Sequence, residues 1–193
     1  MGESRALEGR VAIITGAGGG LGRCHALELA RNGARIVVND LDEGAAGTVA
    51  QTIRENGGEA IAAVCSVTDE AAVARMVDRA TDAWGRIDIL VNNAGILRDK
   101  SFAKMDMADF RLVLDVHLMG AAICTKAVWG HMRAQEYGRI VMTTSSSGLY
   151  GNFGQANYGA AKMALVGLMQ TLAIEGAKYN IRVNALAPTA ATQ

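Results

Sequence analysis

The sequence predicts an α/β fold in which helices flank a parallel β-sheet. Short runs of β-branched and apolar residues alternate along the chain with longer stretches of helical periodicity. The first such run is followed at once by a glycine-rich turn and a helix. Half of the 193 residues are hydrophobic, 23 are glycine and one is proline, which fits tight turns within a single domain over residues 1–193.

The predicted first strand, residues 11–15, is a continuous apolar run, as expected of a strand buried on both faces. It enters the loop TGAGGGLG, which has the spacing G-x-x-x-G-x-G in Gly16, Gly20 and Gly22 rather than G-x-G-x-x-G. Glycines let a backbone turn tightly and approach a pyrophosphate at a helix N-terminus. Many glycine loops only turn, but the place of this one between a strand and a helix favours nucleotide binding.

The second predicted strand ends at Asp40, eighteen residues after Gly22. A carboxylate at that point can accept hydrogen bonds from the ribose hydroxyls of NAD and would repel the 2′-phosphate of NADP. The glycine loop contains no Arg or Lys that could bind this phosphate. Asp40 could instead be a surface residue that begins a turn, but the spacing favours the cofactor role. We therefore expect NAD to be the cofactor.

Two further strands end in small or polar residues. The next elements are expected at residues 42–56 (helix), 60–65 (strand), 69–84 (helix) and 87–93 (strand). Ser66 and Val67 follow the third strand, where Ser66 could bind the edge of the adenine. The fourth strand runs into Asn93, Ala94 and Gly95, two of them small residues, which we expect beside the cofactor crevice.

The segment from Gly138 to Lys162 is predicted to be a buried strand (140–144), a Ser/Gly-rich loop and the start of a helix. Tyr158 and Lys162 lie four residues apart and therefore share one helix face. A fixed ammonium favours the phenolate form of a nearby tyrosine. Ser145, thirteen residues before Tyr158, could donate a hydrogen bond to a substrate oxygen. Taken alone, a Tyr and a Lys at the spacing of Tyr158 and Lys162 are more often a packed ring and a solvated amine.

Taken together, TGAGGGLG, NNAG and a Ser thirteen residues before YGAAK resemble the short-chain dehydrogenase/reductase family over essentially the whole chain. GRIDILVNNAGILRDKSF and GNFGQANYGAAK are similar to the (3R)-hydroxyacyl-CoA dehydrogenase domain of the peroxisomal multifunctional β-oxidation enzyme and its bacterial relatives. The resemblance implies a Rossmann-type doubly wound sheet of strand order 3-2-1-4-5-6. It implies that Tyr158 transfers the proton, that Lys162 binds the ribose and tunes Tyr158, and that Ser145 positions the substrate oxygen. The predicted cofactor-binding set is Gly16, Gly18, Gly20, Leu21, Gly22, Asp40, Ser66, Val67, Asn93, Ala94, Gly95, Tyr158, Lys162 and Pro188.

The chain departs from the family pattern at several places. His117 stands where the family has a fourth catalytic residue, Asn; it could carry a water-linked proton relay, or it could be a satisfied, partly buried histidine. Ser66 replaces the usual Asp beside the adenine, and Pro188 is followed by Thr189 instead of Gly. The chain ends at Gln193, so we expect the family's seventh strand and substrate-covering segment to be missing. We accordingly expect weak nucleotide binding and little turnover from these 193 residues, and an unpaired sixth strand.

The composition argues against several other classes. Lys+Arg and Asp+Glu number 19 each, so nothing indicates a nucleic-acid partner. The three cysteines and three histidines are scattered, which favours thiols in a reducing compartment over disulfides or a metal site. No signal peptide or membrane span is expected, so we predict a cytoplasmic protein. The family resemblance implies that helices near 107–133 and 155–178 pair across a two-fold axis in a homodimer or homotetramer.

The sequence thus predicts an NAD-dependent oxidoreductase that interconverts a secondary alcohol and a ketone, with a 3-hydroxyacyl thioester as substrate. Two alternatives keep the chemistry and change the substrate: a 3-oxoacyl carrier-protein reductase or a hydroxysteroid dehydrogenase. A third alternative is a nucleotide-sensing or scaffold protein without turnover. The intact Ser145, Tyr158 and Lys162 argue against that last alternative.

Overall fold

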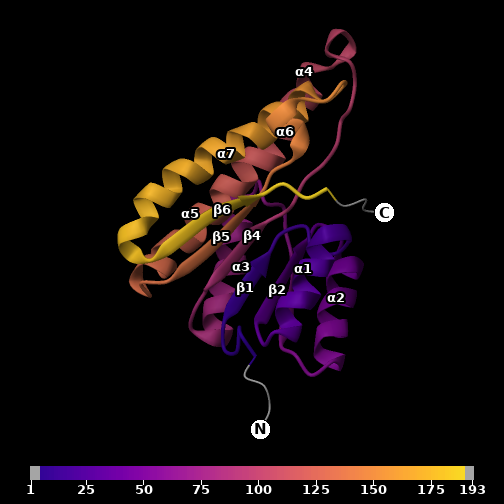
Figure 1. Ribbon diagram of the computed structural model, residues 1–193. Coiled ribbons are helices and arrows are strands. Elements are labelled where there is room, and N and C mark those ends of the chain that lie inside the picture. Colours follow the sequence, from indigo (N-terminus) through magenta and orange to yellow (C-terminus); the bar gives the residue numbers. More distant parts are fainter. Residues whose placement is uncertain (1–4, 190–193) are drawn as a thin grey trace.

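A computed structural model describes residues 5–189 and contains a six-stranded, all-parallel sheet in the order β3-β2-β1-β4-β5-β6 (Figure 1). The predicted fold class and strand order are therefore confirmed. The strands are β1 (Val11–Ile14), β2 (Arg35–Asp40), β3 (Ala60–Val64), β4 (Ile89–Asn92), β5 (Gly138–Thr143) and β6 (Ile181–Leu186). The end of the chain discussed above, residues 190–193, lies outside the described residues.

Helices connect successive strands and cover both faces of the sheet. They are α1 (Gly20–Arg31), α2 (Glu43–Glu55), α3 (Glu70–Trp84), α4 (Met107–Leu114), α5 (Gly120–Ala134), α6 (Ser146–Tyr150) and α7 (Ala156–Gly176). Short 3₁₀ turns occupy Phe102–Lys104 and Ala177–Tyr179. The sequence predicts most of these elements to within two residues, but it misses α6, which lies in the Ser/Gly-rich stretch expected to be a loop.

The two faces of the sheet carry separate hydrophobic cores. Buried alanines of α1 and α2 pack on Ile14, Ile36 and Val38, while α3, α5 and α7 pack on the opposite face around Ile13, Leu90 and Ile140. Strand residues alternate between the two cores, so both faces need apolar side chains, which explains the uninterrupted apolar runs in the sequence. Within residues 5–189, β6 pairs with β5 alone, and the other edge of β6 is unpaired.

Helices α4 and α5 form one continuous helical run, joined by a π-helical turn at Asp115–Met119. By length and composition alone, the run Met107–Ala134 could cross a membrane: an 18-residue window within it has a mean hydropathy of 1.4, and 39% of that window is buried in the protein. Its residues Val113, Cys124, Val128 and Met132 are buried in the protein interior. This packing accounts for part of the apolar character of the run, whose residues Met107, Leu112 and Met119 are exposed.

The amino ends of β1 and β4 are joined through a buried carboxylate. Asp88 is fully buried and accepts hydrogen bonds from Arg10, Arg86 and the N–H of Val11. Burial alone raises the pKa of Asp88, but these donors outweigh burial and hold the pKa below its ordinary value.

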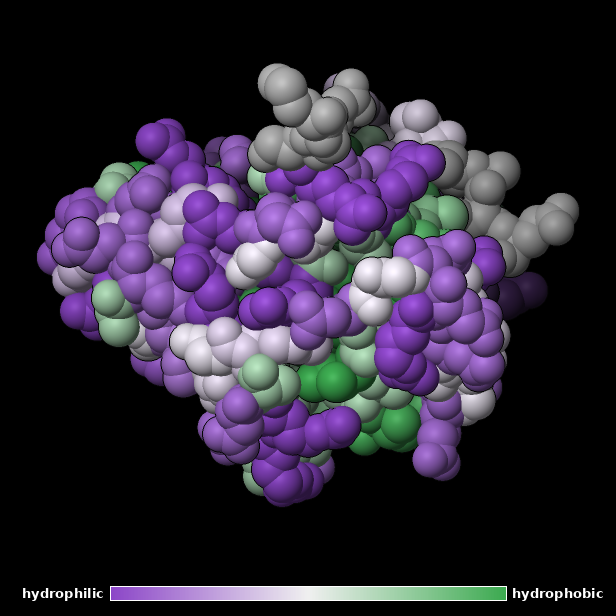
Figure 2. Space-filling view, turned by 90° about the horizontal axis from the view of Figure 1, so that it is seen from below, coloured by the Kyte–Doolittle hydropathy of each residue, from purple (hydrophilic) through white to green (hydrophobic). Residues whose placement is uncertain are grey.

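Seen from below, the molecular surface is mostly hydrophilic, with hydrophobic residues showing mainly in a hollow near its middle (Figure 2).

Candidate active site

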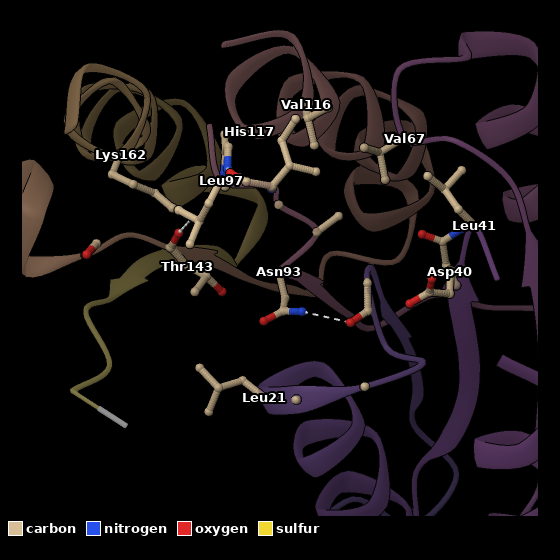
Figure 3. Close-up of a pocket in the computed structure, with 18 of the residues that line it drawn as sticks. Leu21, Asp40, Leu41, Val67, Asn93, Leu97, Val116, His117, Thr143 and Lys162 are labelled. Atoms are coloured by element: carbon tan, nitrogen blue, oxygen red, sulfur yellow. Dashed lines mark hydrogen bonds between the residues drawn. The ribbon is translucent and has the colours of Figure 1, made fainter. Parts of the chain in front are cut away.

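A crevice of about 710 Å³ opens at the carboxyl ends of the strands, where the strand order reverses between β1 and β4. Open α/β sheets bind their ligands at this point. Asp40 lies at one end of the crevice and Lys162 at the other, with Asn93 between them (Figure 3). All but two of the residues predicted for the site line the crevice: Gly16, Gly20, Leu21, Asp40, Ser66, Val67, Asn93, Ala94, Gly95, His117, Ser145, Tyr158, Lys162 and Pro188.

The two exceptions, Gly18 and Gly22, belong to the glycine loop but pack against other protein atoms instead of lining the crevice. A Cβ on Gly22 would be 2.1 Å from the carbonyl oxygen of Gly16, and a Cβ on Gly18 would be 2.8 Å from the Asp40 carboxylate. Both positions therefore require glycine for close packing rather than for contact with a ligand. Gly19 caps α1 without a side-chain hydrogen bond and has open space around it. The first N–H groups of α1 are thus available to a phosphate, so the loop fits a dinucleotide.

Asp40 is fixed by the backbone around it. Its Oδ2 accepts a hydrogen bond from the N–H of Gly18 at 2.9 Å, and its Oδ1 accepts one from the N–H of Asp42 at 3.1 Å. The carboxylate therefore faces the crevice in a defined orientation with lone pairs remaining. Leu41, the next residue, lines the crevice and is 71% exposed. The end of β2 thus presents a negative group followed by an apolar one.

Asn93 joins the ends of β4 and β1. Its side-chain amide donates to the carbonyl oxygens of Thr15 at 2.9 Å and Gly16 at 3.1 Å. The hydroxyl of Thr15 accepts the N–H groups of both Asn93 and Ala94 at 3.0 Å. These bonds fix the glycine loop against the segment after β4, which forms the floor of the crevice.

Ser66 and Val67, which the sequence predicts to bind the adenine, follow the carboxyl end of β3. The Ser66 hydroxyl pairs with the hydroxyl of Thr68 at 2.8 Å, so Ser66 shapes the turn into α3 as well as lining the crevice. Val67 is buried against Gly120, where a Cβ would lie 2.5 Å from Val67 Cγ2. The buried amide of Asn39 bonds the carbonyl oxygens of Ala63 and Cys65 and so holds β3 against β2.

Lys162 is buried at the opposite end of the crevice, with 3% of its surface exposed. Its Nζ donates to the carbonyl oxygen of Thr143, and the hydroxyl of Thr144 donates to the carbonyl oxygen of Lys162 at 2.7 Å. Burial lowers the pKa of Lys162 to about 8, because the interior disfavours the charged form. The ammonium lies 5.4 Å from the centre of the Tyr158 ring, as the helical spacing predicts.

Ser145 lies two residues after the end of β5 and caps α6, where its Oγ accepts the N–H of Ser147 at 3.2 Å. The cap fixes the side chain at the crevice wall and leaves the hydroxyl proton free to donate. The short helix then returns the chain to α7, and Gly148 packs against the Lys162 stem with no room for a Cβ. Ser145, Tyr158 and Lys162 thus line one end of one crevice.

His117 lies in the π-helical turn and is 4% exposed. Its Nε2 is 2.8 Å from the carbonyl oxygen and 3.0 Å from the amide nitrogen of Ile96. Its ring meets the Tyr158 ring edge to face, with centroids 5.2 Å apart. Burial, with a smaller contribution from the Lys162 charge, lowers the pKa of His117 to about 4.

The sequence did not single out several residues that also line the crevice. These are Gly19, Asn39, Leu41, Cys65, Ile96, Leu97, Val116, Thr143 and Thr144. All but Val116 lie within five residues of the carboxyl end of a strand. Their position near the end of a predicted strand is the signal that places them at the crevice. Most of them are apolar, however, and apolar residues in a sequence do not indicate binding or catalysis.

Comparison with known proteins identifies the family. A family model described as short chain dehydrogenase matches residues 10–192. The chain belongs to the short-chain dehydrogenase family. This confirms the predicted family and its oxidoreductase chemistry with a nicotinamide cofactor.

Two curated relatives and one solved structure illustrate this similarity. The chain is 53% identical to peroxisomal multifunctional enzyme type 2 of Drosophila melanogaster, covering 96% of this chain and 32% of the relative. It is 52% identical to a short-chain type dehydrogenase/reductase of Mycobacterium tuberculosis, covering 97% of this chain and 68% of the relative. The crystal structure of NAD⁺-bound xylitol dehydrogenase superposes with a TM-score of 0.92 at 41% identity, covering 95% of this chain and 71% of that one.

This short-chain dehydrogenase thus spans about a third of the length of the multifunctional relative. The NAD⁺-bound neighbour supports the expected cofactor, and the crevice has the open helix N-terminus and the fixed carboxylate that a dinucleotide needs.

Proposed function

We propose that this short-chain dehydrogenase interconverts a secondary alcohol and a ketone with NAD, and that its substrate is a 3-hydroxyacyl thioester. The observation that carries the proposal is the position of Ser145, Tyr158 and Lys162 at one end of a crevice whose other end carries Asp40. This arrangement separates the reacting end from the adenine-ribose end. The 45% identity to a 3-oxoacyl-[acyl-carrier-protein] reductase of Synechocystis and the 41% identity to a (2S)-[(R)-hydroxy(phenyl)methyl]succinyl-CoA dehydrogenase subunit of Thauera aromatica support a thioester substrate.

Each of the three residues has a proposed task in the oxidation of the alcohol. The Ser145 hydroxyl donates a hydrogen bond to the alcohol oxygen and positions it beside Tyr158. The Tyr158 oxygen takes the hydroxyl proton, and NAD held along the crevice would supply the acceptor for the hydride that leaves the same carbon. Lys162, fixed by Thr143, places a positive charge 5.4 Å from the centre of the Tyr158 ring, where it stabilises the negative charge that develops during the reaction. Reduction of a ketone runs the same steps in reverse.

Asp40 is proposed to select NAD over NADP. Its carboxylate is held at the crevice by Gly18 and Asp42 and has lone pairs left for ribose hydroxyls. A 2′-phosphate at the same place would meet this negative charge, and the neighbouring Leu41 offers no compensating cation.

Turnover of defined substrates tests the proposed function. The purified protein that carries this chain is mixed with NAD and (3R)-3-hydroxybutyryl-CoA, and reduced nicotinamide is followed by absorbance. The (3S) enantiomer, a hydroxysteroid and the acyl carrier-protein thioester serve as comparison substrates. We expect the highest kcat/KM for the (3R)-acyl-CoA. Binding of NAD with no turnover of any of these alcohols would instead favour the nucleotide-sensing alternative.

We further propose that the protein is a homodimer or homotetramer built through α5 and α7. Helix α7 is apolar on most sides, and its residues Met163 and Ile174 are 51% and 79% exposed. Apolar surface of this kind on a helix favours burial against another chain. Light scattering of the purified protein measures the assembly, and Ile174→Glu should shift it toward monomer.

The single domain over residues 1–193 and a cytoplasmic location also stand as proposals. The family match over residues 10–192 supports one domain. The three cysteines are free thiols, as suits a reducing compartment. Because the multifunctional relative is named as peroxisomal, fractionation of cells into cytosol and peroxisomes is the test.

A further inference from the structure

The π-helical turn places one aromatic ring between two walls of the reacting end of the crevice. The turn Asp115–Met119 interrupts an otherwise continuous helix and points His117 inward. π-turns inside α-helices often occur at functional sites because the extra residue redirects side chains. The ring of His117 faces the segment after β4 on one side and α7 on the other.

On the β4 side, the ring lies tightly against backbone. A Cβ on Gly95 would be 2.2 Å from Cε1 of His117, so only glycine lets the ring approach this closely. The Nε2 atom lies within hydrogen-bond distance of both polar backbone atoms of Ile96. Either tautomer of the ring therefore binds the backbone of Ile96, through its carbonyl oxygen or through its N–H.

On the α7 side, the ring meets Tyr158 at 5.2 Å between centroids with an interplanar angle of 88°. Edge-to-face pairs of this geometry fix the relative position of two rings. The same histidine thus contacts the crevice wall at Gly95 and Ile96 and the ring of the proposed proton-transfer residue.

We infer that His117 is a positioning residue: a neutral ring spacer that sets the separation between the wall at Gly95–Ile96 and the ring of Tyr158. This inference rests on the proposed function for Tyr158. The spacer role accounts for the glycine at position 95, the two polar contacts to one backbone unit and the edge-to-face packing.

The surroundings of the ring favour a spacer over a water-linked relay. Within residues 5–189 the Nδ1 atom of His117 is buried and has no hydrogen-bond partner. The narrow gap that the ring borders together with Asn92 and Leu165 has no room for a water molecule, so water can reach the ring only through the crevice. The titratable groups that face the ring, Tyr158 and Lys162, both come from α7, and the β4 side offers backbone only. The low pKa of His117, about 4, keeps the ring neutral at physiological pH.

A kinetic test compares His117→Asn and His117→Ala with His131→Asn, a change at a half-buried histidine of α5 outside the crevice. Misplacement of a reacting group by about 1 Å can cost about a hundredfold in rate, so we expect kcat to fall about 10- to 100-fold in both His117 variants. The apparent pKa values of the pH–rate profile should stay as in the unaltered protein. A moved or lost limb of that profile in His117→Asn would show that His117 carries the proton and would overturn the spacer.

A second test needs no activity and therefore separates this inference from the proposed function. Gly95→Ala should lower the melting temperature sharply in the unaltered protein, because the new methyl group overlaps the ring. In a protein that already carries His117→Ala, Gly95→Ala should lower the melting temperature only slightly, because the ring is absent. Gly47→Ala, which has open space around it, is the control and should act equally in both backgrounds. If Gly95→Ala lowered the melting temperature equally with and without the His117 ring, the proposed spacer role would be wrong.

Discussion

The ammonium of Lys162 donates a hydrogen bond to the main-chain carbonyl oxygen of Thr143, at the carboxyl end of β5. With the bond from the Thr144 hydroxyl to the carbonyl oxygen of Lys162, it joins α7 to the strand that leads to Ser145. It holds a buried charge at the reacting end of the crevice without a carboxylate partner among residues 5–189. A buried, unpaired charge lowers the stability of the folded state. The proposed role of Lys162 in catalysis explains why the charge is there.

Replacing Lys162 should therefore stabilise the protein without cofactor while removing its activity. The folded pKa of about 8 lies below the ordinary lysine value, so the unfolded chain binds more protons between about pH 8 and 10.5. The free energy of unfolding should rise with pH across that window. Lys162→Met should flatten this rise and increase the free energy of unfolding at pH 7 by about 2 kcal/mol. Denaturant unfolding at several pH values measures both, and Lys126→Met, at an exposed position of α5, is the control.

His117 should make the folded state sensitive to mild acid. Its folded pKa of about 4 lies below the ordinary value of 6.5, so the unfolded chain takes up a proton first as the pH falls. Stability should thus decrease between pH 6.5 and 4, by up to about 3 kcal/mol. His117→Asn should remove this part of the decrease, whereas His131→Asn should not. Identical pH dependence in all three proteins would show that the ring is not buried as described.

Asp40 should govern the choice of cofactor. We expect NADH to bind more tightly than NADPH, and Asp40→Ala should narrow the difference mainly by removing the repulsion of the 2′-phosphate. Calorimetric titration of both nucleotides is the suitable measurement, because neither Trp84 nor Trp129 lines the crevice. Equal or tighter binding of NADPH by the unaltered protein would overturn the assignment of NAD.

Gly22 should tolerate no side chain. A Cβ there would lie 2.1 Å from the Gly16 carbonyl oxygen and 2.6 Å from the Asn93 amide nitrogen. Gly22→Ala must therefore shift the glycine loop, and we expect a loss of roughly 3 kcal/mol in unfolding free energy together with weaker NAD binding. Gly47 lies in the middle of α2 with open space around it, so Gly47→Ala should instead raise the free energy of unfolding by about 0.5–1 kcal/mol. Thermal unfolding of the two variants makes the comparison.

The sequence predicts those parts of the fold whose physics is local. Apolar runs mark strands that are buried on both faces, and the glycine loop marks the point where a strand turns into α1. The spacing of Tyr158 and Lys162 predicts their shared face because a helix repeats every 3.6 residues. These features need no knowledge of distant contacts.

Other features depend on tertiary packing and could not be predicted in this way. Helix α6 has only five residues, and its sequence SSGLY favours a loop; the Ser145 cap and its packing against α7 stabilise it. The π-turn at His117 lies inside an apolar helical pattern that gives no sign of an extra residue. The role of Gly18 and Gly22 in packing became visible only with the positions of Asp40 and Asn93.

The most direct test of the central claim is the turnover of Tyr158→Phe in the protein that carries this chain. The substitution keeps the ring and its contact with His117 but removes the oxygen that exchanges the proton. NADH formation from (3R)-3-hydroxybutyryl-CoA is measured alongside the dissociation constant of NADH. We expect kcat to fall about a hundredfold or more, and the affinity for NADH to stay within about threefold of that of the unaltered protein. Near-normal turnover by Tyr158→Phe would contradict it.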